Sequence, residues 1–313
     1  MSFYYVEVAS LWGTAIVGTF ATIYSVIFSR DKVSRRSAVF NLVSFLITSL
    51  ALQFVIDRIS PTYAFSFQLQ HKWILPQGAS IFVYLFFADF LFYLYHRLTH
   101  TIPILWVGHY SHHSGDKLHL SLVIRDNIVS HIFVLPMGLL GIPLGVTPYG
   151  LYICMRFVIF YQAFLHFKTK RDWPILNYFL VTQYNHVIHH STRFDGAGHN
   201  FGGILCIWDR LCGTYRAGDE YLNAIGIRDL KNPDSLWNIN AVPTLELLKK
   251  CWTARSAGPL FFFSDASPEL SLSTTPARGQ RTSNWVTAPL YAVALLLALD
   301  IVRRALQFYG IWT

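Results

Sequence analysis

Apolar runs long enough to cross a lipid bilayer recur along the chain, and they limit its fold more than any other feature. A helix needs about 20 consecutive apolar residues to cross the hydrocarbon core. Six segments approach this length, and charged residues, at 13%, are about half as frequent as in soluble domains. These segments span residues 5–29, 39–58, 80–98, 128–147, 149–168 and 285–302. So many runs in one chain predict an integral membrane protein rather than a soluble protein with buried helices.

The basic segment "RDKVSRR" at residues 30–36 follows the first apolar run and predicts the orientation. By the positive-inside rule it lies in the cytoplasm. Threading the chain from there brings the ends of the runs at 80–98 and 149–168 to the cytoplasmic face. No Lys or Arg precedes the first run, so we expect a retained anchor rather than a cleaved signal. Arginines flank the last run on both sides, and its orientation is left open.

The sequence thus predicts an all-α integral membrane protein with about four to six transmembrane or re-entrant helices. The net charge of +8 comes from basic residues that flank the apolar runs. This placement favours contact with anionic lipid head groups over nucleic acid. The four cysteines show no CxxC spacing and receive no role.

Histidines are concentrated in three short motifs, which we call boxes. They are "HRLTH" at 96–100, "HYSHH" at 109–113 and "HVIHH" at 186–190. On a helix, positions three and four apart are neighbours on one face. The HxxHH pattern occurs twice in a chain with only 13 histidines, and chance does not account for this repetition.

Dense clusters of neutral imidazoles indicate metal binding. Each buried ring brings a donor and an acceptor that need partners, and a metal ion takes the acceptor lone pair. The eight histidines of the boxes exceed what one tetrahedral site uses, so we expect two metals in a histidine-rich cytoplasmic cap. Imidazole suits zinc, copper, iron and nickel alike, and no carboxylate recurs at ligand spacing inside the boxes.

The three boxes and the following "NFGGILCIWDRLCGTY" resemble the sterol desaturase and fatty acid hydroxylase superfamily of histidine-rich, integral-membrane di-iron enzymes. The order of the boxes, the apolar hairpin between the second and third, and the tail "WDRLCGTY" all carry the resemblance, over roughly residues 80–220. The stretch "LHLSLVIRD" partly resembles the "LSTALR" stretch of the alkylglycerol monooxygenase group.

This resemblance implies two iron ions, dioxygen as co-substrate and attack on a C–H bond of a lipid. It also adds a histidine at the end of the apolar hairpin to the ligand set. The implied metal ligands are His96, His100, His109, His112, His113, His166, His186, His189 and His190. The chain departs from the pattern at Asn185, where related enzymes often carry another histidine, and at Cys212, where Phe is usual.

Three further residues are expected to support the ligands: Asp89, Gln162 and Asp209. Asp89 lies seven residues before His96, on nearly the same helical face, and is expected to hydrogen-bond a ligating imidazole or else to link neighbouring helices. Gln162 lies one turn before His166. Asp209 is expected to close the cap with Arg210, beside a packing Trp208.

Several residues near the boxes receive other expectations. Arg125 either meets a substrate head group or forms a structural pair, and the sequence leaves both open. The remaining histidines are interpreted as structural, with a site role left open for His131. They are His71, His119, His131 and His199.

The predicted function is a membrane-bound, O2-dependent di-iron oxidoreductase that hydroxylates or desaturates a fatty acyl chain, sterol or ether lipid. The chain has no GxGxxG fingerprint, no CxxCH and no ferredoxin-like cysteine set, so electrons come from a separate donor such as a cytochrome b5, a ferredoxin or a reduced pterin. The alternatives are a histidine-rich metal transporter and a membrane zinc hydrolase. The membrane is bacterial inner membrane or endoplasmic reticulum.

The expected organisation has four parts. They are N-terminal transmembrane helices at 1–79, a catalytic domain at 80–222, a cytoplasmic region with a flexible linker at 223–284 and a last transmembrane helix at 285–313.

Overall fold

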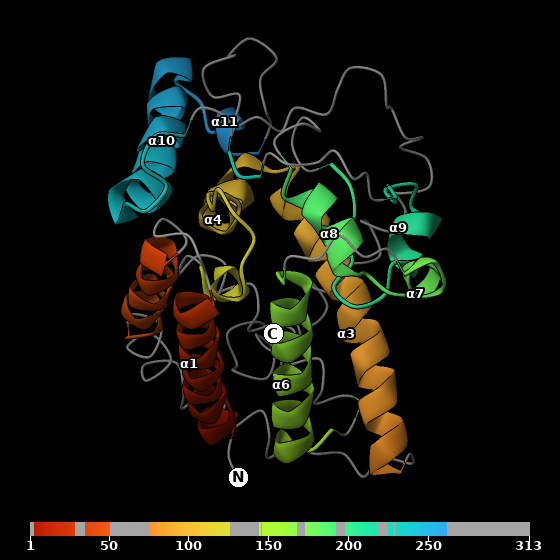
Figure 1. The fold of residues 1–313 in the computed structure, drawn as a ribbon. Coiled ribbons are helices and arrows are strands. Elements are labelled where there is room, and N and C mark those ends of the chain that lie inside the picture. The colour runs from red at the N-terminus through yellow and green to blue at the C-terminus, as the bar shows by residue number, and fades with distance from the viewer. Residues whose placement is uncertain are drawn as a thin grey trace, which may run out of the picture.

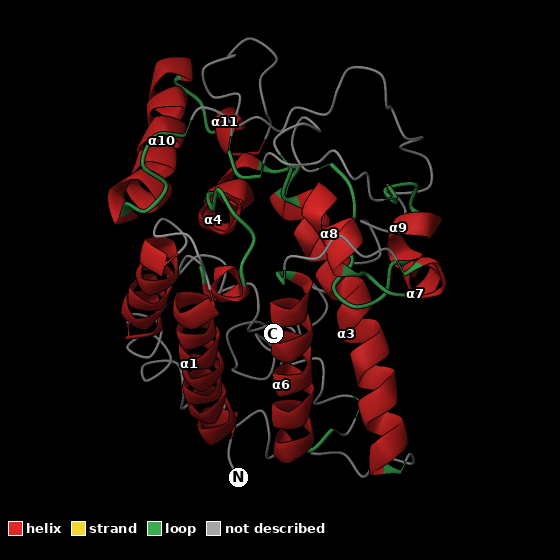
Figure 2. Ribbon diagram, in the orientation of Figure 1, coloured by secondary structure: helices red, strands yellow, loops and turns green. Residues whose placement is uncertain are grey.

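The computed structural model shows helices joined by loops (Figure 1). The residues that it describes are 3–28, 35–50, 76–125, 144, 146–167, 173–191, 198–217, 225–227 and 230–261. No β-strand occurs within these ranges (Figure 2). Two isolated bridges pair Leu180 with Leu205 and Ser191 with Ile225. The predicted all-α class is confirmed for this part of the chain.

Three long apolar helices form one end of the molecule (Figure 1). They are α1 (Phe3–Phe28), α3 (Gln77–Thr99) and α6 (Pro148–Leu165). Helix α6 packs against both α1 and α3. The segment Gly78–Thr99 of α3 is long and apolar enough to cross a membrane, with a mean hydropathy of 1.6. Among the described helices, the apolar segments Gly13–Phe28 and Gly150–Leu165 are shorter.

The predicted apolar runs compare with these helices as follows. The helices expected at 5–29, 80–98 and 149–168 are confirmed as α1, α3 and α6. The run at 39–58 is helical over its described part, to residue 50. Almost all of 128–147 and all of 285–302 lie outside the described residues.

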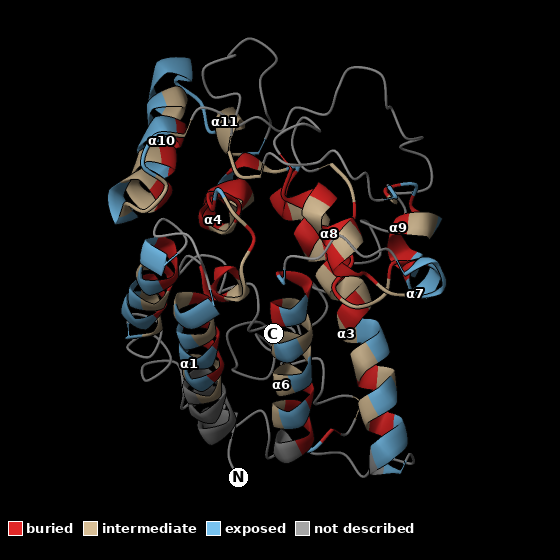
Figure 3. Ribbon diagram, in the orientation of Figure 1, coloured by how far each residue is buried: buried red, intermediate tan, exposed pale blue. Residues whose placement is uncertain are grey.

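Large apolar side chains are exposed along the long helices. Phe82 and Phe86 on α3 and Phe157 and Phe160 on α6 are among them. Figure 3 shows the exposed residues along the shafts of these helices and the buried residues gathered near α4 and α8. Exposed apolar surface on this scale is unusual for a protein in water.

Short helices cover the ends of α3 and α6 where the buried residues gather (Figures 1 and 3). They are α4 (Pro103–His113), η1 (Leu120–Ile124), α7 (Pro174–Phe179), α8 (Gln183–His189) and α9 (Ile207–Leu211). Pro103 explains why α3 stops and α4 starts: the residue before a proline avoids the helical region, and Ile102 is extended, with φ −117° and ψ 118°. The turn between the two helices brings the first two histidine boxes together.

The described C-terminal residues pack beside this cap. They form a π-helical turn, η2 (Trp237–Ala241), followed by α10 (Val242–Ala254) and α11 (Gly258–Phe261). Helix α10 packs against α4, with Pro243 and Leu247 buried.

An apolar core joins α3 to the segment 201–212. Tyr93 and Leu94 of α3 pack there with Phe201, Trp208 and Cys212. This core fixes the loop after the third histidine box against α3, with Phe201 beside the ring of His96.

Candidate metal centre

The nine predicted ligand histidines lie in or next to the ends of four helices. His96 and His100 end α3, and His166 caps the C-terminus of α6. The last turns of α4 carry the second box, and α8 with its C-cap carries the third. Because all four helices end in the same place, residues from positions 96 to 190 of the sequence meet in one buried region.

The structure brings these nine side chains together in two groups. Within each group the possible ligand atoms all lie within 4.8 Å of one another. The first histidine group contains His96, His100, His109, His113 and His189. The second histidine group contains His112, His166, His186 and His190.

The second and third boxes divide their histidines between the groups in mirrored fashion. In an HxxHH box the first and fifth positions lie one turn apart on one side of the helix, and the fourth lies about 100° round from the fifth. In α4 the first and fifth histidines join the first group and the fourth joins the second, whereas α8 does the reverse. The second and third boxes therefore each supply both groups.

Ring nitrogens inside each group approach one another closely. In the first group, His109 Nε2 lies 3.0 Å from His96 Nε2 and 3.1 Å from His113 Nε2. In the second group the corresponding contacts are 3.2 Å for His166 with His112, 3.3 Å for His186 with His166 and 3.2 Å for His190 with His186. Ligands at about 2.1 Å from one metal ion are about 3.0 Å apart at right angles and about 3.4 Å apart in a tetrahedron. The observed spacings match those of nitrogen atoms that share an ion.

Backbone carbonyls fix the tautomer of three of these rings. His96 Nδ1 lies 2.8 Å from the Phe201 carbonyl oxygen, and His189 Nδ1 lies 3.0 Å from that of His199. His166 Nδ1 is 2.7 Å from the Gln162 carbonyl oxygen. A neutral ring that donates through Nδ1 presents a bare lone pair at Nε2, which is the arrangement usual for metal-bound histidine.

Unpartnered polar atoms in the same region support a metal. Both ring nitrogens of His100 are buried without a hydrogen-bond partner, as is His189 Nε2. A buried polar atom without a partner costs about 1–3 kcal/mol. Metal coordination would satisfy one nitrogen of His100 and the unpartnered nitrogen of His189 in the first group. Together with the nitrogen spacings in the second group, this means that the residues fit two metal ions.

Burial also keeps these imidazoles neutral. It lowers their pKa well below the usual 6.5, and the neighbouring rings lower it further because protonated rings repel one another. The rings affected in this way outside the long helices are His100, His109, His112, His113, His186, His189 and His190. The neutral form is the one that binds a metal.

Asp209 holds the loop that contacts His96. One of its carboxylate oxygens accepts hydrogen bonds from Phe201 N at 2.8 Å and Thr214 Oγ1 at 2.7 Å, and the other accepts one from Gly202 N at 2.8 Å. These bonds orient the Phe201 carbonyl that receives the His96 proton. Burial raises the pKa of Asp209 to about 6, so the carboxylate is ionised at neutral pH.

Asp89 forms its hydrogen bonds with other groups than the imidazole that the sequence suggested. Its carboxylate accepts hydrogen bonds from Ile204 N at 2.7 Å, Leu205 N at 3.1 Å and Trp208 Nε1 at 2.8 Å. Seven residues along a helix correspond to about 10 Å, so a shared face does not bring Asp89 within reach of His96. The carboxylate instead ties the loop and α9 to α3, which corresponds to the alternative of a link between neighbours.

Gln162 supports the second group through its backbone. Its carbonyl accepts from His166, as described above, and its side-chain Nε2 donates to the Gly203 carbonyl at 2.7 Å. Arg210 donates from Nη2 to the Asn177 carbonyl at 3.0 Å and lies over the Tyr215 ring, which fastens α9 to α7. Trp208 packs between Phe86 and Phe90 in addition to its bond to Asp89.

The other predicted positions lie outside the two groups. His119 Nδ1 is 2.8 Å from Ser121 Oγ. His71 and His131 lie outside the described residues. The side chain of Asn185 is buried without a partner, and Cys212 is packed in the apolar core.

Sequence reasoning missed the carbonyls of Phe201 and His199, because a backbone acceptor leaves no side-chain signal. It also missed Asn200, whose amide donates to the Asn185 carbonyl at 2.9 Å and to the Arg216 carbonyl at 2.9 Å. Asn200 has φ 58°, a left-handed conformation that asparagine tolerates better than most residues. The "HNFGG" stretch was the available signal.

Comparison with known proteins agrees with this geometry. Residues 81–214, which contain the nine histidines, match the family model of fatty acid hydroxylases. Over these residues, which make up less than half of the chain, the protein is similar to the fatty acid hydroxylase superfamily. Within it, the likeness to the alkylglycerol monooxygenase group is also supported. No solved structure matches the chain.

Three curated proteins illustrate the similarity. Human alkylglycerol monooxygenase is 29% identical over 179 residues, 56% of this chain and 38% of that protein. Alkylglycerol monooxygenase of Danio rerio is 33% identical over 132 residues, 41% of this chain and 28% of that protein. The ornithine lipid hydroxylase OlsE of Rhizobium tropici is 28% identical over 141 residues, 45% of this chain and 43% of that protein. The chain spans less than half the length of each.

Proposed function

We propose that this protein is a membrane-bound, O2-dependent di-iron monooxygenase that hydroxylates, or desaturates, a lipid. The observation that carries the proposal is the pair of adjacent histidine groups, each with its ligand atoms within 4.8 Å, at the ends of apolar helices. The three relatives described above are all named as lipid hydroxylases or monooxygenases, which supports the same chemistry.

The donor set favours iron over zinc. Structural zinc is almost always four-coordinate, whereas the first histidine group offers five nitrogen donors. When bound, two iron ions would supply activation of dioxygen and oxidation of a C–H bond.

The residues of the chain then have defined tasks. The nine histidines hold the ions through neutral nitrogens, and the carbonyls of Phe201, Gln162 and His199 orient three of the rings. Asp209 orients the Phe201 carbonyl from behind. Burial of the whole region excludes bulk water from the metals.

We also propose the membrane arrangement. The protein is multi-pass, its histidine cap lies on the cytoplasmic side, and residues 80–222 form the catalytic domain. Exposed apolar side chains such as Phe157 on α6 and Phe86 on α3 face lipid. A lipid substrate enters laterally from the bilayer, and a separate donor such as a cytochrome b5, a ferredoxin or a reduced pterin supplies electrons.

The two alternatives fit less well. A metal transporter places its ligands near the bilayer midplane of discontinuous helices, whereas these donors lie at the ends of helices in a protein-covered region. A zinc hydrolase needs a general base beside an open metal position. In the described part of the chain, the residues grouped around each site are all histidines.

Metal analysis followed by an oxygen assay tests the proposal. The purified chain is expected to hold two iron ions and to consume O2 when given a reduced donor and a lipid from a panel of alkylglycerols, ornithine lipids and fatty acids. His189→Ala is expected to lose iron and O2 consumption, and His71→Ala, which removes a histidine outside the proposed set, is expected to retain both. Stoichiometric zinc without iron, or iron without lipid-dependent O2 uptake, contradicts the proposal.

A further inference from the structure

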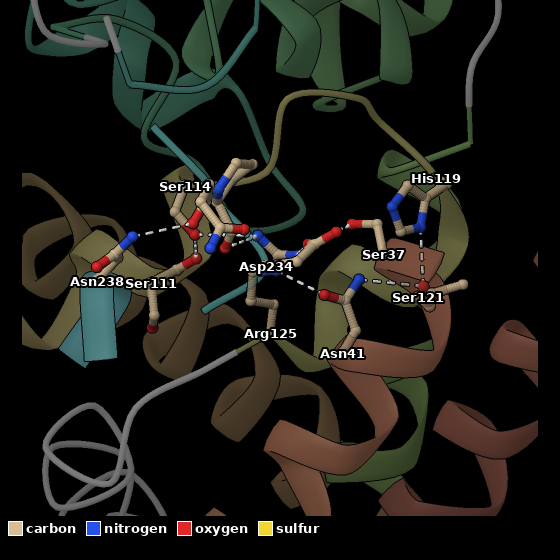
Figure 4. A network of polar contacts seen from close by, with 12 residues as sticks. Ser37, Asn41, Ser111, Ser114, His119, Ser121, Arg125, Asp234 and Asn238 are labelled. Atoms are coloured by element: carbon tan, nitrogen blue, oxygen red, sulfur yellow. Dashed lines mark hydrogen bonds and ion pairs between the residues drawn. The ribbon is translucent and has the colours of Figure 1, made fainter. Parts of the chain in front are cut away.

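Arg125 is the centre of a buried polar network beside the second histidine box (Figure 4). A guanidinium has five N–H donors, and each donor of Arg125 has an acceptor. The acceptors are Asn41 Oδ1 at 2.5 Å from Nε, Ser114 Oγ at 3.1 Å and the Pro233 carbonyl at 3.2 Å from Nη1, and Ser37 Oγ at 3.0 Å and Asp234 Oδ1 at 2.5 Å from Nη2. No donor is left for a substrate head group, which settles the choice that the sequence left open in favour of a structural pair.

The network joins three parts of the chain that are distant in sequence. Ser37 and Asn41 belong to the helix at residues 35–50, and Asp234 belongs to the C-terminal region. Ser114 caps the C-terminus of α4. Breaking a buried ion pair by removing one partner is strongly destabilising, so the Arg125–Asp234 pair holds these parts in one arrangement.

Arg125 is also linked to the metal-binding region through Ser114. Ser114, which accepts from its side chain, follows His113 in the chain. His112 belongs to the second histidine group and His113 to the first. Arg125 therefore lies beside the C-terminal end of α4, which supplies histidines to both groups.

The residues that precede Asp234 in the chain contact α4 and the C-terminal end of α8. Gly226 N donates to the His190 carbonyl at 3.0 Å. Ile227 and Leu230 pack against Trp106 and Tyr110 of α4. The φ of Gly226 is 102°, and a Cβ there would lie 2.9 Å from the Gly115 carbonyl oxygen, so the close approach needs glycine. These residues lie beyond position 214, where the match to the family model ends.

We propose that Arg125 and Asp234 are positioning residues of the metal centre. Their ion pair fixes the C-terminal end of α4 against residues 225–227 and 230–234 and thereby sets the positions of His112 and His113. This inference rests on the proposed function only in taking the two histidine groups as metal sites. Arg125 and Asp234 touch neither metal nor substrate and act through the two histidines.

Cobalt binding to the full-length protein tests the inference, because Co(II) reports its own ligand geometry through its visible absorption. The purified, metal-free chain and its variants are titrated with Co(II) alone. Asp234→Asn keeps the shape of the side chain and removes its charge. It is expected to weaken Co(II) binding by about 10–100-fold, the usual effect of losing a group that supports a ligand, and to shift the absorption bands at saturation. Asp234→Glu keeps the carboxylate and is expected to recover much of the affinity.

Arg156→Gln is the matched control. Arg156 of α6 joins that helix to α1 by donating to Thr14 Oγ1 at 3.0 Å, and it lies about 15 Å along the helix from His166. Its loss is expected to lower thermal stability while leaving Co(II) affinity and absorption unchanged. This comparison separates positioning of the ligands from general destabilisation.

Ser114→Ala provides a milder test should Asp234→Asn fail to fold. It removes one acceptor from Arg125 and is expected to weaken Co(II) binding severalfold. Wild-type affinity and absorption in folded Asp234→Asn, or in Ser114→Ala if the former does not fold, overturn the inference. Failure of the unchanged chain to bind metal instead contradicts the proposed function, so the two failures are distinguishable.

Discussion

Replacement of Asp89 is expected to separate the role seen in the structure from the one suggested by the sequence. Its two oxygens accept three N–H donors from residues 204–208. Asp89→Ala leaves all three donors without a partner, and each buried unsatisfied donor costs about 1–3 kcal/mol. The expected loss of stability is therefore about 3–9 kcal/mol.

Asp89→Asn is expected to be milder. Its remaining oxygen can take the position that accepts from Leu205 N and Trp208 Nε1, and its amide then faces Ile204 N, so one bond is lost. The expected cost is about 1–3 kcal/mol. Asp116→Ala, at an exposed position, is the control and is expected to change stability by less than about 0.5 kcal/mol.

Unfolding in detergent micelles, followed by tryptophan fluorescence, measures these differences. Each kcal/mol corresponds to about 2–4 °C in melting temperature for chains of 150–250 residues and to somewhat less for a chain of 313 residues, and the order Ala, Asn, control is still resolvable. Metal content of the folded Asp89→Asn protein is expected to stay near two ions per chain, because Asp89 bonds to no histidine ring. Equal stability of the Ala and Asn variants, or loss of metal from a fully folded Asn variant, refutes the reasoning.

Three further predictions concern the loop, pH and metal. Gly202→Ala places a Cβ 2.5 Å from the backbone oxygen of Leu205, so it is expected to destabilise the protein by about 1–3 kcal/mol in the same unfolding assay, and a neutral result contradicts the close packing. The metal-free protein is expected to lose stability as pH falls below 6.5. Buried rings such as His113 and His190 have a lowered pKa and stay neutral in the folded state, whereas the same rings take up protons in the unfolded state. Each ring contributes up to about 1.4 kcal/mol per pH unit, and a flat stability profile between pH 6.5 and 5 disproves this. Removing metal by a chelator is expected to lower the unfolding free energy by about 2.7 kcal/mol for each ion present at 100 times its Kd, and re-addition of iron is expected to restore it, while a melting temperature insensitive to the chelator argues against bound metal.

The sequence carried the histidines of the site and little of what orients them. The boxes stood out because their spacing repeats on a helical face, and the structure groups all nine of the named side chains. The division of each HxxHH box between two groups follows from helix geometry alone and could have been predicted from the sequence. The role of the Phe201 carbonyl could not be predicted, because its position depends on hydrogen bonds from Phe201 N and Gly202 N to Asp209 that form only when the loop folds.

Two misjudged or undecided residues show the limit of periodicity. Asp89 shares a helical face with His96, yet periodicity gives an angle around the helix and says nothing of the distance along it that a short side chain can bridge. Arg125 could not be assigned because its partners Ser37, Asn41 and Asp234 lie more than 80 residues away on both sides. The three long helices were predictable from composition, since apolar length is a local property.

The mirrored division of the two HxxHH boxes makes the two halves of the centre inseparable. Because α4 and α8 each supply rings to both groups, neither of these two helices can be removed, shifted or rotated without disturbing both groups at once. A chain that lost the second or the third box would keep parts of two sites and a complete version of neither. Partial loading is therefore disfavoured, and a population given too little metal is expected to divide into empty and doubly filled molecules.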